Sequence, residues 1–422
     1  MSSMNLAQRG EQTIGGLRDL WSSLQSRHER TTIILLALIC LSVIFSTAIV
    51  QALVVALTVL VLAGGLFGHS FRWRRTPLDA PYLVFLVGRI ASIALSQYPS
   101  QSLRALYVEY FFYLMFFLVT QSIRGDELST ARFLTSLLVA AGVVAGLIGA
   151  LKVILLADPR GSSTTAGPYT LGTFLCPVLA LALFLPRAWK EGKGGNLIRL
   201  APLIICLGIL STFDRLHWFG MALILAAGAL LLRRRAGFIA ACFVLLLAPV
   251  LPSVRVRIEQ TMDLGAFMAG RDVLWRGASL LITDHPIAGF GPRTFNSIFP
   301  LFAEMPIRGV GSWHNDYLQV YMESGLLGLL PLLWIIGATY YQCWNLFRAT
   351  PLPSHTRAFV LSLLVSISAV VLLGGMLDTH VGIVFRILLG LLALMMGDLP
   401  PRIMAPAGSS ADTHIGNVTH SA

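Results

Sequence analysis

The chain repeats one pattern along most of its length: apolar stretches separated by short polar segments. A helix needs about 20 mostly apolar residues to cross the hydrocarbon core of a bilayer. Hydrophobic residues make up 56% of the 422 residues and charged residues only 12%. A typical soluble domain has a charged share of about 25%. The pattern therefore predicts an all-α integral membrane protein.

About twelve apolar stretches are long enough to be candidate membrane spans. They cover residues 31–50, 52–68, 80–97, 104–122, 133–156, 169–186, 198–213, 216–232, 236–252, 325–346, 358–376 and 380–397.

These spans divide the chain into five segments. Segment 1–30 precedes the first nine expected spans within 31–251, and a polar insert at 252–324 separates them from three more within 325–398. The Ser/Thr/Ala-rich tail, 399–422, has a composition that predicts disorder. An insert of about 70 residues exceeds an ordinary connection, and such loops are usually functional.

The insert itself is expected to be helical in part. A helix is predicted over 272–283, where His285-Pro286 would stop it, and a second helix is predicted from Asn315 directly into the tenth span. The insert thus predicts a small helical subdomain outside the bundle of spans.

Basic residues are unevenly divided between alternate loops. Clusters such as 72–75 and 233–235 fall on the same side as the N-terminus, whereas the short loops of the other side hold only Arg104, Arg160 and Arg215. Loops rich in Lys and Arg stay in the cytoplasm. Both termini are therefore expected in the cytoplasm and the insert outside. The net charge of +11 reflects this topology, and no nucleic-acid partner is expected.

Three residues at the outside face are candidates for chemistry. His314 titrates near neutrality, so it can accept a proton from an attacking hydroxyl; the alternative is a helix-start residue that caps or packs. Arg215 and Arg271 carry planar guanidinium groups that bind phosphate oxygens in pairs. The alternatives are an ion pair of Arg215 with Asp214 and a solvated helix start at Arg271.

Two further charged residues need an explanation from their surroundings. Arg89 lies within an apolar stretch, where a lone charge costs about 2.5–3.5 kcal/mol. It should be paired or face a cavity, and Glu109 is one candidate partner. Asp378 lies between the last two spans, where an acid can orient a histidine or bind a sugar hydroxyl; a plain loop acid is the alternative.

Several motifs are absent from the sequence. It contains no GxxxxGK[ST], so nothing indicates ATP hydrolysis. It contains no DxD pair, which argues against a metal-held nucleotide-sugar donor, and no HExxH. Neither a metal nor a cofactor is expected, so a phosphate leaving group would have to be neutralised by arginines.

A series of short motifs follows in order between Arg215 and Gly328. They are Asp214-Arg215 in a short turn, Gly270-Arg271 opening a helix with Trp275 after it, Gly289-Phe-Gly291, His314-Asn-Asp-Tyr-Leu318 and Glu323-Ser-Gly-Leu-Leu-Gly328. In order, spacing and topological side, this series resembles the O-antigen ligase and O-antigen polymerase superfamily of bacterial inner-membrane glycosyltransferases, which have GT-C-like folds.

The resemblance implies substrates and a reaction. The donor would be a polysaccharide on undecaprenyl diphosphate and the acceptor a sugar hydroxyl of lipid A–core. Transfer would be metal-independent, would invert the anomeric centre and would face the periplasm. His314 would deprotonate the acceptor hydroxyl, and Arg215 and Arg271 would bind the diphosphate. The candidate substrate-binding residues are Arg160, Asp378 and Arg89.

Other functions stay open on the sequence alone. Within the superfamily these are the O-antigen polymerase and a protein O-oligosaccharyltransferase, for which a longer chain would be expected. A lipid-linked oligosaccharide flippase belongs to a different class, but transporters commonly show repeats and midplane sites. Here the polar candidates gather on one face. A non-enzymatic scaffold, with His314 and the arginines as ordinary loop residues, is the last alternative.

Overall fold

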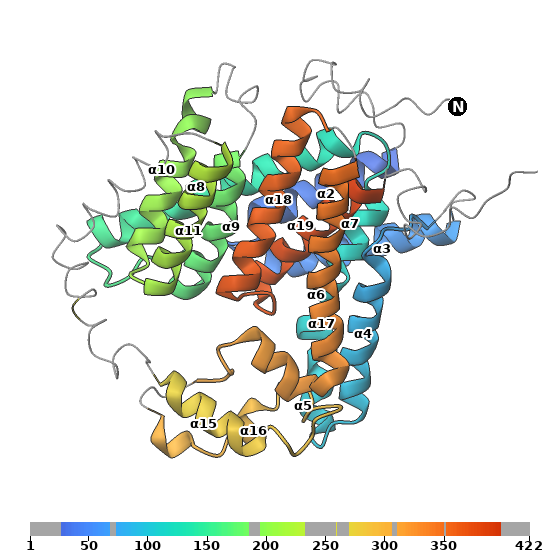
Figure 1. Ribbon diagram of the computed structural model, residues 1–422, viewed down its shortest axis with the longest axis vertical. Coiled ribbons are helices and arrows are strands. Elements are labelled where there is room, and N and C mark those ends of the chain that lie inside the picture. Colours follow the sequence, from blue (N-terminus) through green and yellow to red (C-terminus); the bar gives the residue numbers. More distant parts are fainter. Residues whose placement is uncertain are drawn as a thin grey trace, which may run out of the picture.

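The computed structural model describes residues 27–67, 73–184, 195–232, 259, 270–305, 310–349 and 352–397. Over these residues every regular element is a helix, which confirms the all-α prediction. Figure 1 shows a bundle of helices above a smaller group that contains α15 (Arg271–Leu281) and α16 (Phe295–Ile298). Two long helices, α4 (Asp79–Ala94) and α17 (Asp316–Ala349), run side by side between the two groups.

The other helices build the bundle, except that α5 lies beside the smaller group (Figure 1). They are α2 (Arg27–Ser42), α3 (Thr47–Phe67), the run α5 (Pro99–Ala105), η2 (Leu106–Tyr110), α6 (Phe111–Tyr113) and α7 (Met115–Ser122), then α8 (Glu127–Leu155), α9 (Pro168–Phe184), α10 (Gly195–Ser211), α11 (Arg215–Leu232), α18 (Ser354–Leu373) and α19 (Thr379–Gly397).

Six of the described helices are long and apolar enough to cross a membrane. They are α3, the α5–α7 run, α8, α17, α18 and α19; α9 and parts of α10 and α11 are shorter apolar helices. The chain is therefore a multi-pass membrane protein. A count of twelve spans is not confirmed: α2 and α4 have 16 residues each, and the expected span 236–252 lies outside the described residues.

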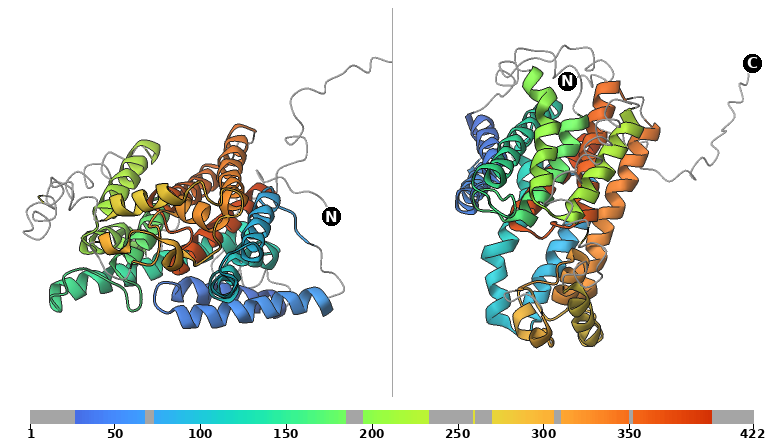
Figure 2. Two further views of the ribbon diagram at one scale, coloured as in Figure 1. Left: turned by 90° about the horizontal axis from the view of Figure 1, so that it is seen from below. Right: turned by 90° about the vertical axis from the view of Figure 1, so that its left-hand side faces the viewer.

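The first two predicted spans have the wrong boundary. Instead of one helix over 31–50, α2 ends at Ser42 and α3 begins at Thr47; the two helices lie side by side (Figure 2, left). Ser42 Oγ donates to Leu38 O at 2.7 Å, and Ser46 Oγ accepts from Ile49 N at 3.3 Å. Serine hydroxyls that bond to nearby backbone groups favour helix ends over helix interiors.

The part of the insert that the structure describes has a hydrophobic core of its own, which we call the subdomain core. Its buried members come from α15, from the segment around α16, from the residue before His314 and from the start of α17: Val273, Leu274, Ala278, Phe290, Phe295, Phe299, Trp313 and Met322. Trp313 is 1% exposed, and its ring lies 5.0 Å from Phe295 and 5.6 Å from Phe299, edge-on to both. This core positions His314, the next residue in the chain.

Helix α17 is broken at Gly325, which has φ 54° and ψ −148°. The broken helix leaves the carbonyls of Met322 and Glu323 without their usual partners, and they accept the N–H groups of Phe290 and Gly291 at 2.8 and 3.0 Å. In return, the N–H groups of Leu326 and Leu327 donate to the carbonyls of Pro286 and Ile287 at 2.8 and 3.0 Å. Segment 286–291 therefore supplies partners to four backbone groups at the break.

We predict that Gly325→Ala breaks this junction. A Cβ there would lie 2.3 Å from the Ile287 carbonyl oxygen, in a left-handed backbone conformation that only glycine adopts freely. The expected result is a loss of about 2–4 kcal/mol of stability from strain and lost hydrogen bonds, read as a lower melting temperature in detergent. The control is Gly337→Ala in the same helix, where a Cβ meets open space and stability should not fall.

Candidate functional site

A cavity of about 590 Å³ lies between one end of the bundle and the subdomain. The bundle contributes Tyr169 of α9, Leu216 of α11 and the α18–α19 connection, and the subdomain contributes α15, the turn before α16 and the start of α17. Its charged and histidine side chains are Glu109, Arg271, Arg293, His314, Asp316, Glu323 and Asp378. The cavity thus brings together residues from five distant parts of the sequence.

His314 lines the cavity between the subdomain core and the first turn of α17. Its backbone has φ 50°, and a left-handed conformation outside glycine often occurs at functional sites. Two neighbours hold this geometry: Trp313 N donates to Gln319 Oε1 at 2.9 Å, and Asn315 Oδ1 caps α17 by accepting from Leu318 N at 3.0 Å. The imidazole itself is exposed to the cavity.

The environment of His314 lowers its pKa below the usual 6.5. Partial desolvation of the ring is the first cause, and the positive charge of Arg271 is the second, because both disfavour the imidazolium form. A neutral imidazole is the form that can accept a proton. The lowered pKa of His314 therefore favours the neutral, proton-accepting form of its ring.

Arg271 is the first residue of α15 and also lines the cavity. Gly270, with φ 82°, turns the chain into the helix. Within the described residues Arg271 forms no hydrogen bond or ion pair, so its guanidinium lacks a carboxylate partner there. Trp275, one turn later and 50% exposed, lines the same wall. An arginine at a cavity wall that has no carboxylate partner in the described part of the chain attracts anions.

Arg215 and Arg160 lie near the rim of the bundle. Arg215 opens α11 and is followed by Leu216, which lines the cavity, although Arg215 itself does not. Asp214 pairs with Arg160 at 3.3 Å, and Arg160 Nε donates to Thr212 O at 2.8 Å. Burial alone would raise the pKa of Asp214, but His217, whose Nδ1 lies 3.4 Å from Asp214 Oδ1, and Arg160 hold it well below its usual range. Arg160 thus fastens the α10–α11 turn and lies outside the cavity lining.

Asp378 lines the cavity but also caps α19. Its Oδ1 accepts from the backbone N–H groups of His380 at 2.8 Å and Val381 at 2.9 Å, and its Oδ2 accepts from Thr170 Oγ1 at 3.2 Å. The contact to His380 is with its backbone and leaves the ring unoriented by Asp378. Asp316 makes a similar tie, since its Oδ2 accepts from Met376 N at 2.7 Å. These carboxylates fix the α18–α19 connection that forms one cavity wall.

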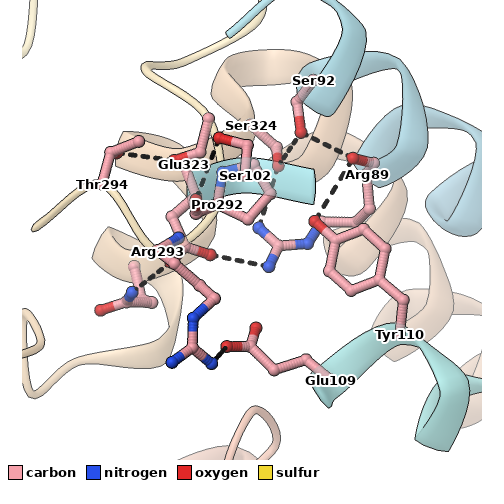
Figure 3. Close-up of polar contacts among 12 residues, drawn as sticks. Arg89, Ser92, Ser102, Glu109, Tyr110, Pro292, Arg293, Thr294, Glu323 and Ser324 are labelled. Carbon is pink, nitrogen blue, oxygen red and sulfur yellow. Dashed lines mark hydrogen bonds and ion pairs between the residues drawn. The ribbon is translucent and has the colours of Figure 1, made fainter. Parts of the chain in front are cut away.

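Arg89 is fully buried and does not pair with Glu109, so that expected pairing is wrong. Its Nη2 donates to Glu323 Oε2 at 2.7 Å and its Nη1 to Ser324 Oγ at 2.9 Å (Figure 3). Its guanidinium also lies 5.1 Å from the ring centre of Tyr110. Glu323, the partner of Arg89, belongs to α17, which packs closely against α4. At Gly88 of α4 the two helices leave no room for a side chain, since an added Cβ would lie 2.0 Å from the Leu327 carbonyl oxygen. Arg89 lies behind the cavity wall rather than in it.

Glu323 connects this buried pair to the cavity. Its Oε1 accepts from Gln319 Nε2 at 2.6 Å and from Arg293 N at 3.0 Å. Gln319 in turn holds the backbone N–H of Trp313. The chain of contacts from Arg89 to Trp313 therefore supports the segment that carries His314.

The structure adds two cavity residues that the sequence analysis did not select. Arg293 and Glu109 form an ion pair of 2.9 Å at the cavity wall (Figure 3). Arg293 follows Gly-Pro and has φ 61°, and Glu109 lies in the π-helix η2. An intramembrane acid is a functional candidate by default, so Glu109 carried a usable signal; Arg293 carried none. Among the described residues, no group of three or more His, Cys, Asp or Glu side chains is placed to hold a metal ion.

The fold and the cavity define a multi-pass membrane protein with a histidine- and arginine-lined site at one end of its bundle. Residues 200–333 match the family model described as O-antigen ligase. Over these residues, the match confirms the resemblance to the O-antigen ligase family that the sequence predicted. The matched segment includes Arg215, Arg271, Arg293 and His314, whereas Glu109 contributes from outside it. No curated protein matches the chain.

Proposed function

We propose that this protein is an O-antigen ligase, which transfers a polysaccharide from undecaprenyl diphosphate to a sugar hydroxyl of lipid A–core. The observation that carries the proposal is a cavity that holds a neutral-leaning histidine, His314, and an arginine without a carboxylate partner in the described residues, Arg271. The family match supports the same chemistry. The site would face the periplasm of the bacterial inner membrane, with both termini in the cytoplasm, as the basic loops indicate.

In the proposed reaction the acceptor oxygen attacks the anomeric carbon of the donor sugar. His314 takes the proton of that hydroxyl as the new C–O bond forms. The bond between the anomeric carbon and the diphosphate oxygen breaks, and its electron pair leaves with undecaprenyl diphosphate. Arg271, with Arg215 at the rim, stabilises the charge that develops on the leaving group. Attack opposite the leaving group inverts the anomeric centre, and no step requires a metal.

The other predicted site residues receive supporting roles in this proposal. Asp378 shapes the wall near the acceptor, since it both lines the cavity and caps α19. Arg160 holds the turn from which Arg215 projects. Arg89 supports the wall through Glu323. Membrane lipids surround the apolar faces of the bundle.

The pH dependence of transfer should report His314. Because its pKa is lowered, the rate should rise with pH through an inflection below 6.5 and be flat near neutrality. Arg271→Ala removes one cause of the lowering, so the inflection should move to higher pH. The measurement is a pH–rate profile of the wild type and of that variant at saturating donor. An inflection that stays in place in Arg271→Ala would contradict the electrostatic coupling.

Replacing the arginines should weaken use of the donor. Arg271→Ala and Arg215→Ala are each expected to lower kcat/KM for the donor about 10- to 100-fold, because hydrogen bonds to charged groups contribute about 1.5–3 kcal/mol. Lys at either position keeps the charge and should lose less. The control is Arg276→Ala. Arg276 lies on the same helix as Arg271 and forms an exposed ion pair with Glu304. An equal loss with Lys and Ala would show that paired guanidinium geometry, rather than charge, is required.

A transfer assay tests the proposed function directly. Purified protein is mixed with undecaprenyl-diphosphate-linked glycan and lipid A–core in the presence of a chelator, and the product is read as a shift of the lipid A–core band. A shift that depends on His314 supports the ligase. Lengthening of the donor glycan without a shift would instead identify an O-antigen polymerase. Glycan on a protein acceptor would identify an O-oligosaccharyltransferase, and no product at all would favour a flippase or a scaffold.

A further inference from the structure

Part of the polar lining of the cavity has no role in the proposed transfer step. It includes Glu109, Arg293, Asn296 and Gln319. The Glu109–Arg293 pair is open to the cavity, with side chains 25% and 40% exposed. An ion pair this exposed adds little to stability, so its contribution to the fold does not account for it.

Glu109 reaches the cavity because of an irregular helix. Residues Leu106–Tyr110 form a π-helical turn inside an otherwise α-helical run. Such turns are rare and frequently occur at functional sites, because the extra residue redirects the side chains around it. Here Tyr110 lies against the buried Arg89 while Glu109 faces Arg293 (Figure 3).

Arg293 reaches the cavity through an unusual backbone conformation. Its φ of 61° is unfavourable for a residue with a side chain. The surroundings enforce it: Glu323 Oε1 accepts the Arg293 N–H at 3.0 Å, and Ser102 Oγ donates to the carbonyl of Pro292 at 3.1 Å. Two independent irregularities, on elements far apart in the sequence, thus bring one carboxylate and one guanidinium together at the same wall.

The two arginines that line the cavity differ in their charge partners. Arg271 lacks a carboxylate partner in the described residues, which suits an anionic diphosphate. The charge of Arg293 is instead compensated by Glu109. A compensated pair attracts an anion weakly, but it offers hydrogen-bond acceptors and donors side by side, and the Asn296 amide offers both. Neutral hydroxyl groups need that combination.

We propose that Glu109 and Arg293, with Asn296, form a saccharide subsite that binds sugar hydroxyls of one of the two glycans while the reaction occurs at His314. The carboxylate of Glu109 accepts from the hydroxyls and the guanidinium of Arg293 donates to them. This proposal rests on the proposed ligase function, because it assigns the subsite to a glycan substrate of that reaction.

Glu109→Gln tests the subsite because two explanations of the ion pair predict opposite changes in KM. If the pair binds hydroxyls, losing the carboxylate removes a strong acceptor and raises one glycan's KM, by about ten-fold for one hydrogen bond to a charged group. If Arg293 is instead an anion contact that Glu109 restrains, the same change frees its charge and lowers the donor KM. The two KM values are measured separately, each with the other substrate saturating, together with kcat.

Each outcome has one meaning. A raised acceptor KM with the donor KM unchanged supports the subsite and assigns it to the acceptor glycan; a raised donor KM supports it and assigns it to the donor glycan. A lowered donor KM overturns the proposal, and so does an effect on kcat alone or no effect. Wild-type protein without transfer activity would contradict the proposed function instead, so the two failures can be told apart.

A matched control and a second variant complete the experiment. Glu304→Gln breaks the exposed pair of Glu304 with Arg276, 2.7 Å long and on the same subdomain, whose members do not line the cavity; both KM values should stay unchanged. Should Glu109→Gln fail to fold, Asn296→Ala tests the same subsite at an exposed residue outside the ion pair. An unchanged KM for both glycans in Asn296→Ala would then count against the proposal.

Discussion

Replacing His314 is expected to lower transfer by about 10²–10⁴-fold, the usual contribution of a general base, while the protein stays folded. The ring is exposed to the cavity and forms no hydrogen bond within the described residues, so its loss should not disturb packing. His314→Ala removes the base but places alanine at φ 50°. His314→Asn is the cleaner variant, because Asn adopts that backbone conformation more readily. Both should assemble in the membrane at wild-type levels.

The measurement is the rate of lipid A–core modification at fixed protein concentration, with a size-exclusion profile in detergent as the folding check. His285→Ala is the matched control, since His285 also lies in the subdomain but bonds to Gln97 away from the cavity lining. Near-normal transfer by His314→Asn would remove the base from the proposed mechanism and revive the scaffold hypothesis.

The second large effect is expected from the buried pair of Arg89 and Glu323. Both side chains are almost completely shielded, at 0% and 4% exposed. Removing one partner leaves the other charge buried, which typically costs about 3–5 kcal/mol. Glu323→Ala should therefore lower stability strongly and also reduce transfer, because it releases Gln319 and the backbone of Arg293.

This effect is measured as a melting temperature: the protein is heated in detergent, and unfolding is monitored as the loss of the monodisperse peak in size-exclusion chromatography. Arg89→Met combined with Glu323→Leu removes both charges and should recover much of the lost stability, since buried pairs are often replaceable by apolar residues. Transfer should stay low in this double variant, because the contact to Gln319 is still missing. A Glu323→Ala protein as stable as Glu304→Ala, which breaks an exposed pair, would contradict the assigned role of burial.

The lengths of the apolar stretches alone located most of the described helices, because a helix must have enough consecutive apolar residues to cross a bilayer. The pattern failed where polar side chains act locally. Ser42 and Ser46 end and begin helices within an apolar run, so the predicted 31–50 span divides at 43–46. The break at Gly325 was equally hidden, since a glycine inside an apolar helix is often tolerated. Its conformation depends on hydrogen bonds to segment 286–291, which only the tertiary structure supplies.

The site was predictable where chemistry and position coincide in one residue. His314 was selected as a loop residue close to an expected span and Arg271 as the residue that opens a helix of the insert, and the structure places both at the cavity. Partners were not predictable, because they come from distant elements: Glu323 is 234 positions from Arg89. The capping role of Asp378 had a local signal in the sequence, an acid just before an apolar helix.

The exchange of hydrogen bonds at Gly325 bears on how the cavity can move. Separating segment 286–291 from α17 would leave four backbone groups without partners. At the start of the same helix, Asp316 Oδ2 accepts from Met376 N of the α18–α19 connection at 2.7 Å, and Tyr317 Oη donates to Val371 O of α18 at 2.9 Å. The first turns of α17 are therefore bonded both to the subdomain and to the bundle, and we expect the cavity wall that they form to move with the bundle as one rigid unit.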